Sequence, residues 1–180
     1  MPHDRSPDLS LTARALDHPD SAQLLHDYAV ERRAMVGFDD PPDLDRKVEY
    51  DPPVGLFVVA YTALGEPVAC GGIGTYAKAD RVAEVRKMFV VPHHRNQGLA
   101  RRVLAHLESF GAAQGVQRVL LETGSYNRAA THLYPSAGYD PIPPYVPGRP
   151  DFNRAYAKTL TESAVRGTGR CVDPSALSGS

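Results

Sequence analysis

Hydrophobic residues along this chain fall into two kinds of pattern. Short apolar or alternating runs, typical of β-strands, cover residues 9–16, 56–61, 68–75, 82–91, 119–122 and 155–160. Between these runs, apolar residues recur every three or four positions, as on one face of an α-helix, over residues 20–36, 99–110 and 127–136. Because helical and extended patterns are interspersed along the chain, we expect a mixed α/β sheet with helices on its faces.

Proline and glycine mark where these elements end. Gly65-Glu66-Pro67 predicts a turn between two strands, and Pro92 predicts the end of the strand before it. Asp20 or Ser21 is the expected N-cap of the first helix. The apolar positions of that helix are Leu24, Leu25, Tyr28, Ala29 and Met35. Residues 141–150 contain five prolines, which predicts an irregular segment.

The composition fits one ordinary domain followed by a tail. The chain has 180 residues, of which 42% are hydrophobic, enough to bury a core without disulfide bonds. We expect one domain over residues 1–160 and a tail rich in Gly and Ser over residues 161–180. Cys70 lies in an apolar run and is expected in the core. Cys171 is far from it, and this spacing indicates neither a disulfide framework nor a zinc site.

Charge is distributed unevenly, although the total is close to zero. The formal net charge is −1, which argues against a general nucleic-acid-binding surface. Residues 1–53 carry 12 acidic and 6 basic side chains, whereas residues 54–180 carry 9 acidic and 14 basic ones. No secretory signal begins the chain, and no run approaches the roughly 20 apolar residues of a membrane helix. We therefore expect a cytoplasmic protein that binds neither nucleic acid nor membrane.

The segment that follows the strand at 82–91 carries the clearest chemical signal. It reads Pro92-His93-His94-Arg95-Asn96-Gln97-Gly98-Leu99-Ala100 and leads directly into a helix. Backbone N–H groups at a helix start bind anions, and Gly98 allows a ligand to approach closely. Arg95, Arg101 and Arg102 crowd the same helix start, where the helix dipole disfavours cations. A polyanion bound there would explain them, and solvated surface arginines are the alternative.

Two segments together resemble the GCN5-related N-acetyltransferase (GNAT) superfamily. Residues Arg95 to Ala100 fit its Arg/Gln-x-x-Gly-x-Gly/Ala pyrophosphate-binding motif. Asn127-x-x-Ala130-x-x-Leu133-Tyr134-x-x-x-Gly138-Tyr139 is similar to its Asn-x-x-Ala-x-x-Leu-Tyr-x-x-x-Gly-Phe segment, with Tyr139 in place of the usual Phe. Both lie in order within residues 82–142. The resemblance implies a single-domain α/β fold with a largely antiparallel central sheet flanked by helices.

The resemblance also implies acetyl-coenzyme A as the acyl donor and no metal. Its pyrophosphate would be held by the backbone amides of Arg95, Asn96, Gln97, Gly98, Leu99 and Ala100. Arg101 or Arg102 would lie near the nucleotide's phosphates. The pantetheine arm would pair with main-chain groups of Met88, Phe89 and Val90, and Asn127 would hydrogen-bond or position that arm.

The resemblance makes Tyr134 the expected general acid, beside the thioester sulfur. An ordinary tyrosine has a pKa of about 10 and therefore carries the proton that the departing thiolate needs. A ring packed in the core is the alternative interpretation. Because the acceptor amine must lose a proton to attack, a base is also needed, unless orientation alone supplies the rate.

Glu84 is the first candidate for that base. In a regular strand it shares one face with Arg86, Met88 and Val90, and apolar covering of that face would favour proton uptake by a carboxylate. Pairing with Arg86 or positioning of the substrate are the alternatives for Glu84. Glu122 on the next strand is the second candidate. His93 and His94 adjoin the expected pyrophosphate-binding turn and are expected to be loop residues.

We expect the acceptor site between the acidic residues 39–51 and the proline-rich segment that carries Tyr145 and Phe152. An acidic rim attracts a cationic acceptor, although a merely solvated loop is the alternative. The predicted reaction transfers an acetyl group from acetyl-CoA to a primary amine of a small molecule, by direct attack in a ternary complex. The open alternatives are acetylation of protein N-termini or lysines, and a non-catalytic acyl-CoA sensor. A homodimer is also left open, because dimers are common in the family.

Overall fold

A seven-stranded sheet organises the chain, with the strand order β1-β2-β3-β4-β5-β7-β6. The computed structural model describes residues 9–37, 49–53, 55–77, 81–148 and 150–160. Its strands are β1 (Leu9–Ala13), β2 (Leu56–Thr62), β3 (Pro67–Ala77), β4 (Val82–Val90), β5 (Arg118–Gly124), β6 (Asp140–Ile142) and β7 (Asn153–Thr159). Within these residues β4 and β5 pair in parallel, and the other neighbouring strands are antiparallel. The expected mixed, largely antiparallel sheet is confirmed.

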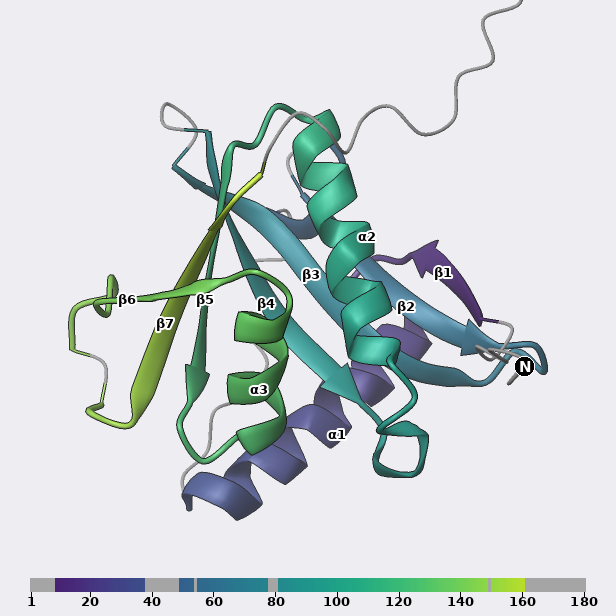
Figure 1. Cartoon of the computed structure of the whole chain (residues 1–180). Coiled ribbons are helices and arrows are strands. Elements are labelled where there is room, and N and C mark those ends of the chain that lie inside the picture. Colours follow the sequence, from purple (N-terminus) through teal and green to yellow (C-terminus); the bar gives the residue numbers. More distant parts are fainter. Residues whose placement is uncertain (1–8, 38–48, 54, 78–80, 149, 161–180) are drawn as a thin grey trace, which may run out of the picture.

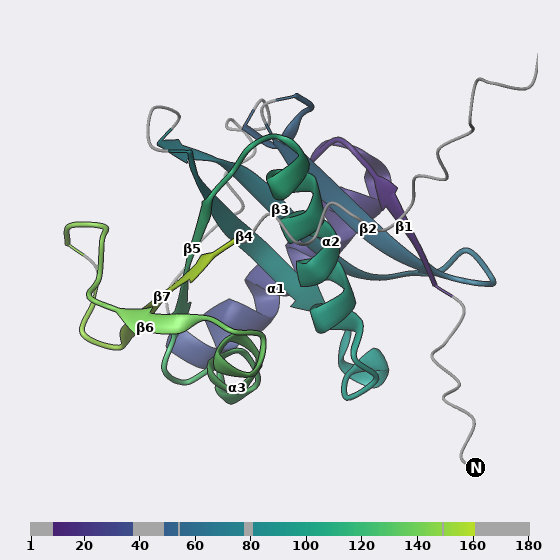
Figure 2. The same cartoon turned by 45° about the horizontal axis from the view of Figure 1, so that its top comes forward.

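Helices cover both faces of the sheet. They are α1 (Pro19–Val36), α2 (Leu99–Ala113) and α3 (Arg128–Ser136), and a short 3₁₀ turn, η2 (Pro92–His94), precedes α2. In Figure 1, α2 crosses the front of the sheet, α1 lies behind it, and α3 lies at the lower end of β5. The view in Figure 2 keeps α2 and α1 on opposite sides of the central strands. Strand β2 is buried along nearly all of its length because both of its faces are covered.

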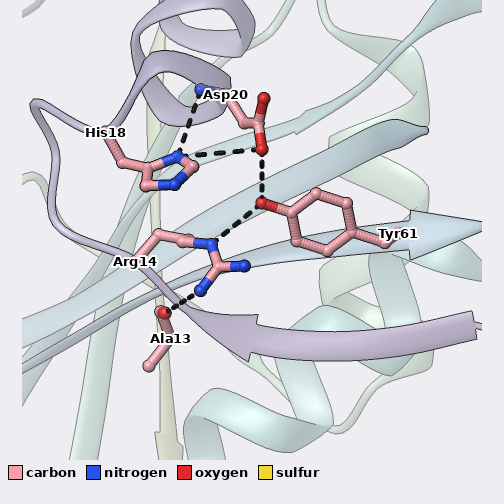
Figure 3. A network of polar contacts seen from close by, with 5 residues as sticks. All are labelled: Ala13, Arg14, His18, Asp20 and Tyr61. Carbon is pink, nitrogen blue, oxygen red and sulfur yellow. Dashed lines mark hydrogen bonds and ion pairs between the residues drawn. The ribbon is translucent and has the colours of Figure 1, made fainter. Parts of the chain in front are cut away.

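The start of α1 is fixed by a small polar network (Figure 3). His18 is the N-cap, and its Nδ1 accepts a hydrogen bond of 3.3 Å from the backbone N–H of Asp20. The Asp20 carboxylate accepts from the Tyr61 hydroxyl at 2.7 Å, and that hydroxyl accepts from Arg14 Nε at 3.0 Å. The predicted N-cap, Asp20 or Ser21, is therefore wrong. Both residues lie in the first turn, because Pro19 occupies the first helical position.

The predicted elements are found close to their expected bounds, with three local differences. Strand β1 ends at Ala13 instead of extending to residue 16. Pro141 lies in β6, opposite Tyr156 of β7, so the segment 141–150 begins as a strand and is not wholly irregular. An edge strand tolerates proline because its outer N–H groups face no partner strand. Met35 is 49% exposed and does not belong to the packed face of α1.

Some expectations lie outside the described residues. These are the tail at 161–180, Cys171, and residues 39–48 of the acidic segment. Cys70 is described and is buried, as predicted. Its thiol lies 3.5 Å from the carbonyl oxygen of Lys87, to which it donates, and burial raises the pKa of Cys70 to about 12. Cys70 is therefore a core residue without thiolate character.

Candidate active site

The two parallel strands separate after a short paired region. Ladder pairs join Val82 to Arg118, Ala83 to Val119 and Glu84 to Leu120, and β4 then continues to Val90 without pairing to β5. Figure 1 shows the two strands diverging, with α3 near the open end. Backbone groups along the free edge of β4 are therefore left for another partner. An extended ligand could pair with them as an added strand would.

A bulge in β4 changes which side chains share a face. Lys87 has a φ of +58°, and the register on β3 shifts between Cys70 and Gly72. A Cβ atom at Gly71 would lie 2.5 Å from the Met88 sulfur and close to α2, so Met88 faces α2. The predicted common face of Glu84, Arg86, Met88 and Val90 is therefore wrong. An added residue in one strand reverses the alternation, so Met88 and Val90 lie opposite Glu84 and Arg86.

The turn after β4 presents its backbone to the start of α2. Asn96 and Gly98 both adopt left-handed conformations, with φ of +61° and +76°. Gly98 is the N-cap of α2 and makes no side-chain capping bond, and the first turn contains no acidic residue. Asn96, Gln97 and Gly98 are exposed. The N–H groups at this helix start are thus arranged to bind an anion, as the motif implies.

The three arginines near this turn have different partners. Arg95 donates from Nη2 to the Glu31 carboxylate of α1 at 2.6 Å and from Nε to the Val90 carbonyl at 2.9 Å. Arg101 donates to the carbonyl oxygen and the hydroxyl of Ser136 at the end of α3, at 3.0 and 2.6 Å. Arg102 donates to the carbonyl of Leu9 in β1 at 3.3 Å. Their side chains contact three different elements, and the explanation of all three by a bound polyanion stays a prediction.

Helix α3 carries the other two predicted residues. Asn127 is its N-cap, and the Asn127 side-chain oxygen accepts from the Ala130 N–H at 3.1 Å. Tyr134 is buried, with its ring centroid 5.9 Å from those of Tyr139 and Tyr156. Burial, chiefly, raises the pKa of Tyr134 well above its usual value. Its hydroxyl therefore stays protonated at neutral pH, as a proton donor requires.

Glu84 lies in polar surroundings rather than under the expected apolar cover. Its Oε2 lies 2.7 Å from Nε of Arg86, so the alternative of pairing with Arg86 is realised. Its Oε1 accepts a hydrogen bond of 2.8 Å from the Tyr145 hydroxyl. Burial, followed by the charges of Glu84 and Glu122, raises the pKa of Tyr145 far above its usual value. Because the charges of both Glu84 and Glu122 act on the pKa of Tyr145, both candidate bases lie near it. Glu122 also accepts a hydrogen bond of 3.5 Å from Asn153 Nδ2.

A polar cavity of about 160 Å³ opens beside this carboxylate. Its lining residues come from three separate segments of the chain: Glu49, Tyr50, Gly74, Thr75, Tyr76, Glu84 and Arg86. The ring of Tyr76 packs edge to face against Tyr145, with centroids 5.4 Å apart. Two glycines of β3 allow Glu49 and Tyr50 to pack against this strand. A Cβ at Gly72 would lie 2.6 Å from the Tyr50 ring, and one at Gly74 would lie 2.8 Å from the Glu49 carbonyl oxygen.

The surroundings of this cavity were predicted only in part. Tyr145 does reach the candidate base, and Glu49 of the acidic segment does line the cavity. Tyr50 and Tyr76 were missed as cavity residues. The alternation of Gly72 and Gly74 along β3 was the available signal for Tyr50, because two positions without side chains on one strand face let another segment pack closely there, as Glu49 and Tyr50 do.

A family model described as the acetyltransferase (GNAT) family matches residues 22–139 of this chain. The chain belongs to the GNAT family. The match includes the strand β4, the turn that starts α2, and α3, and it confirms the resemblance inferred from the two motifs.

GNAT relatives support this assignment at the level of sequence and fold. An IAA acetyltransferase of Azospirillum brasilense is 36% identical over 95 residues, which are 53% of this chain and 61% of the relative. An uncharacterised N-acetyltransferase of Escherichia coli K-12, YjgM, is 32% identical over 105 residues, covering 56% and 61%. The chain thus covers less than two thirds of these curated relatives.

Solved structures agree on the fold. A Klebsiella pneumoniae structure assigned as an acyl-CoA N-acyltransferase superposes with a TM-score of 0.74 at 24% identity, over 86% of this chain and 99% of that one. Identity at this level shows a shared fold. Among the described helices, none has both the length and the hydropathy needed to cross a bilayer.

Proposed function

We propose that this GNAT-family protein transfers an acetyl group from acetyl-CoA to a primary amine of a small molecule, by direct attack in a ternary complex. The observation that carries the proposal is the free edge of β4 after Glu84, which leads directly to the uncapped start of α2. An extended arm ending in a pyrophosphate matches this sequence of features, because the strand edge offers backbone hydrogen bonds and the helix start binds anions.

The donor site would be made of main-chain groups. Met88, Phe89 and Val90 pair with the pantetheine arm, and the amides from Arg95 to Ala100 hold the pyrophosphate. The side chain of Arg95 is engaged by Glu31, and its backbone N–H donates to the Pro92 carbonyl at 3.3 Å, so Arg95 contributes to the donor site only by sharing that N–H. Arg101 can approach a phosphate only by giving up its two bonds to Ser136. Asn127 positions the arm while its side-chain oxygen caps α3.

Tyr134 is the proposed general acid. The amine nitrogen attacks the thioester carbonyl carbon, and the carbon–sulfur bond breaks as the tetrahedral intermediate collapses. The Tyr134 proton passes to the departing thiolate. The raised pKa of Tyr134 keeps its hydroxyl protonated at neutral pH but also makes it a weaker acid, so the proton transfer requires that the bound donor lower this pKa as negative charge develops on the sulfur.

Glu84 is the proposed general base and receives the proton lost by the amine. Each carboxylate oxygen has two lone pairs, and the contacts to Arg86 and Tyr145 use one on each oxygen. The remaining positions are available to an ammonium group or to a bridging water in the adjoining cavity. Two carboxylates, Glu49 and Glu84, outnumber the one cation, Arg86, in the lining of this cavity, and this balance suits a cationic acceptor.

A small acceptor is favoured over a protein by the size of the cavity. About 160 Å³ admits a short aliphatic or ring-bearing amine, well below the roughly 300–1,000 Å³ of drug-sized pockets. The name of the Azospirillum relative, IAA acetyltransferase, supports acetyl transfer as the reaction. The soluble, cytoplasmic location that this role requires is part of the proposal.

The test is acetyl-CoA turnover across a panel of primary amines, with release of CoA and the mass of the product measured together. We expect product with at least one cationic small amine, and a loss of kcat of about 10²-fold or more for Tyr134→Phe and Glu84→Gln. Tyr139→Phe is the matched control, because it installs the usual family residue beside Tyr134 and leaves the proposed machinery intact. Turnover of peptides alone would support the protein-acetylating alternative, and CoA binding without any turnover would support a sensor.

A further inference from the structure

Three potential metal ligands meet beside the turn that leads into α2. Glu66 comes from the turn between β2 and β3, and His93 and His94 form the end of η2. Their ligand atoms all lie within 4.8 Å of one another, and the described residues contain no second group of this kind. We propose that Glu66, His93 and His94 form a binding site for a divalent transition-metal ion, best matched by Zn²⁺.

The distances fit a shared ion better than direct contacts. Oε1 of Glu66 lies 3.6 Å from Nε2 of His93, and Oε2 of Glu66 lies 3.7 Å from Nε2 of His94. Both distances exceed the usual 2.7–3.2 Å of a nitrogen–oxygen hydrogen bond. Zinc bonds of about 2.1 Å in a tetrahedron place neighbouring ligand atoms about 3.4 Å apart. The two carboxylate–imidazole distances are therefore close to those around one shared ion, and all the ligand atoms lie within 4.8 Å of one another.

The donor set selects the class of metal. Two imidazoles and one carboxylate suit Zn²⁺, Co²⁺, Ni²⁺ or Cu²⁺, whereas Mg²⁺ and Ca²⁺ take oxygen ligands. Three protein ligands leave one tetrahedral position for water. Because His93 is 71% exposed and Glu66 is 54% exposed, solvent can reach that position and an ion can enter directly.

The backbones that carry these ligands are already held in place. The N–H of Glu66 donates to the Thr62 hydroxyl at 3.2 Å within its own turn. The N–H of His94 donates to the Val91 carbonyl at 3.0 Å, and the N–H of Val91 donates to the Val68 carbonyl of β3 at 3.0 Å. Binding would thus order side chains only, which limits its entropic cost. The ion would link the β2–β3 turn to the segment that enters the proposed donor turn.

The experiment uses the full chain without a histidine tag, treated with a chelator and then titrated with Zn²⁺ and, separately, Co²⁺. Calorimetry at about pH 7.5, where an ordinary imidazole is neutral, measures affinity and stoichiometry. We expect one Zn²⁺ per chain, with affinity reduced at least tenfold by His94→Ala, His93→Ala and Glu66→Gln. Co²⁺ should give the intense visible absorption of tetrahedral coordination. His106→Ala removes an exposed histidine on α2 and should change neither result.

Two outcomes overturn the proposal. One is the absence of Zn²⁺ binding by the unsubstituted chain at micromolar concentration, which would make the cluster a simple imidazole–carboxylate group. The other is binding that the three substitutions leave unchanged, which would place the ion elsewhere. Far-UV circular dichroism of each metal-free variant checks that the fold is intact, and neither outcome depends on acetyl transfer.

Discussion

The hydrogen bond between Tyr145 and Glu84 offers the sharpest test of the site geometry. Tyr145→Phe removes the hydroxyl that donates to Glu84 at 2.8 Å and keeps the ring that packs against Tyr76. A hydrogen bond to a charged group contributes about 1.5–3 kcal/mol to stability. Because Tyr145 is half-buried beside an open cavity and Glu84 keeps Arg86, we expect the lower end, about 1.5 kcal/mol.

Urea unfolding followed by circular dichroism measures this loss, which suits a chain that lacks tryptophan. With a slope of about 2 kcal/mol per molar urea, the midpoint should fall by about 0.75 M. Tyr76→Phe is the matched control. Its hydroxyl belongs to a half-exposed side chain, so the midpoint should move by less than about 0.2 M, the equivalent of an ordinary surface change.

A double-mutant cycle assigns the loss to this contact. Tyr145→Phe should cost about 1 kcal/mol less when Glu84 is already alanine, because the acceptor is then missing. An equal cost in both backgrounds would refute the reasoning, since the hydroxyl would then stabilise the protein through some other group.

Further predictions concern local features of the fold, each checked by the same unfolding assay unless stated. Gly71→Ala should destabilise by about 1–3 kcal/mol, because its Cβ would press into the packing between β3 and α2. Lys87→Val should cost about 1–2 kcal/mol at a φ of +58°, whereas Lys87→Gly should be neutral or stabilising. His18→Ala should destabilise the protein by about 0.5–2 kcal/mol because it removes the α1 cap, whereas His18→Asn should keep most of the stability that the cap provides. In a Cys171→Ser background, Cys70 should resist thiol reagents at about pH 8 until the chain unfolds, because burial raises its pKa to about 12; rapid labelling of the folded chain would contradict its burial.

The turn into α2 could be predicted because its residues carry a local signal. Asn96 and Gly98 are residue types that adopt left-handed conformations readily, and the motif around them fixes their order. The bulge in β4 gave no such signal. Lysine at position 87 reads as an ordinary strand residue, so alternation across it predicted the wrong face for Met88 and Val90. The one residue that the bulge adds, marked by a positive φ at Lys87, reverses the alternation of side chains between the two faces beyond it.

Long-range polar partners were the other part that the sequence left undetermined. Arg95 and Arg101 are near neighbours in the chain, yet their partners are Glu31 in α1 and Ser136 in α3. Tyr145, whose hydroxyl donates a hydrogen bond to Glu84, is 61 positions away from it in the chain. Such pairings depend on how the elements pack, and local composition contains no information about which surface each side chain will meet. The residue types therefore indicated the chemistry of the site, whereas the packing of the elements determined which residues pair with one another.

The proline in β6 limits how copies of this chain can associate. Pro141 offers no N–H, and the strand that contains it is only three residues long. A second molecule would therefore find little on that side to continue the sheet, which protects this boundary from strand-to-strand aggregation. Strand β1 forms the opposite boundary of the sheet and has no proline between Leu9 and Ala13. If two copies associate through continuous strands, the two-fold axis should pass beside β1, and a proline placed at Leu11 should leave the protein monomeric.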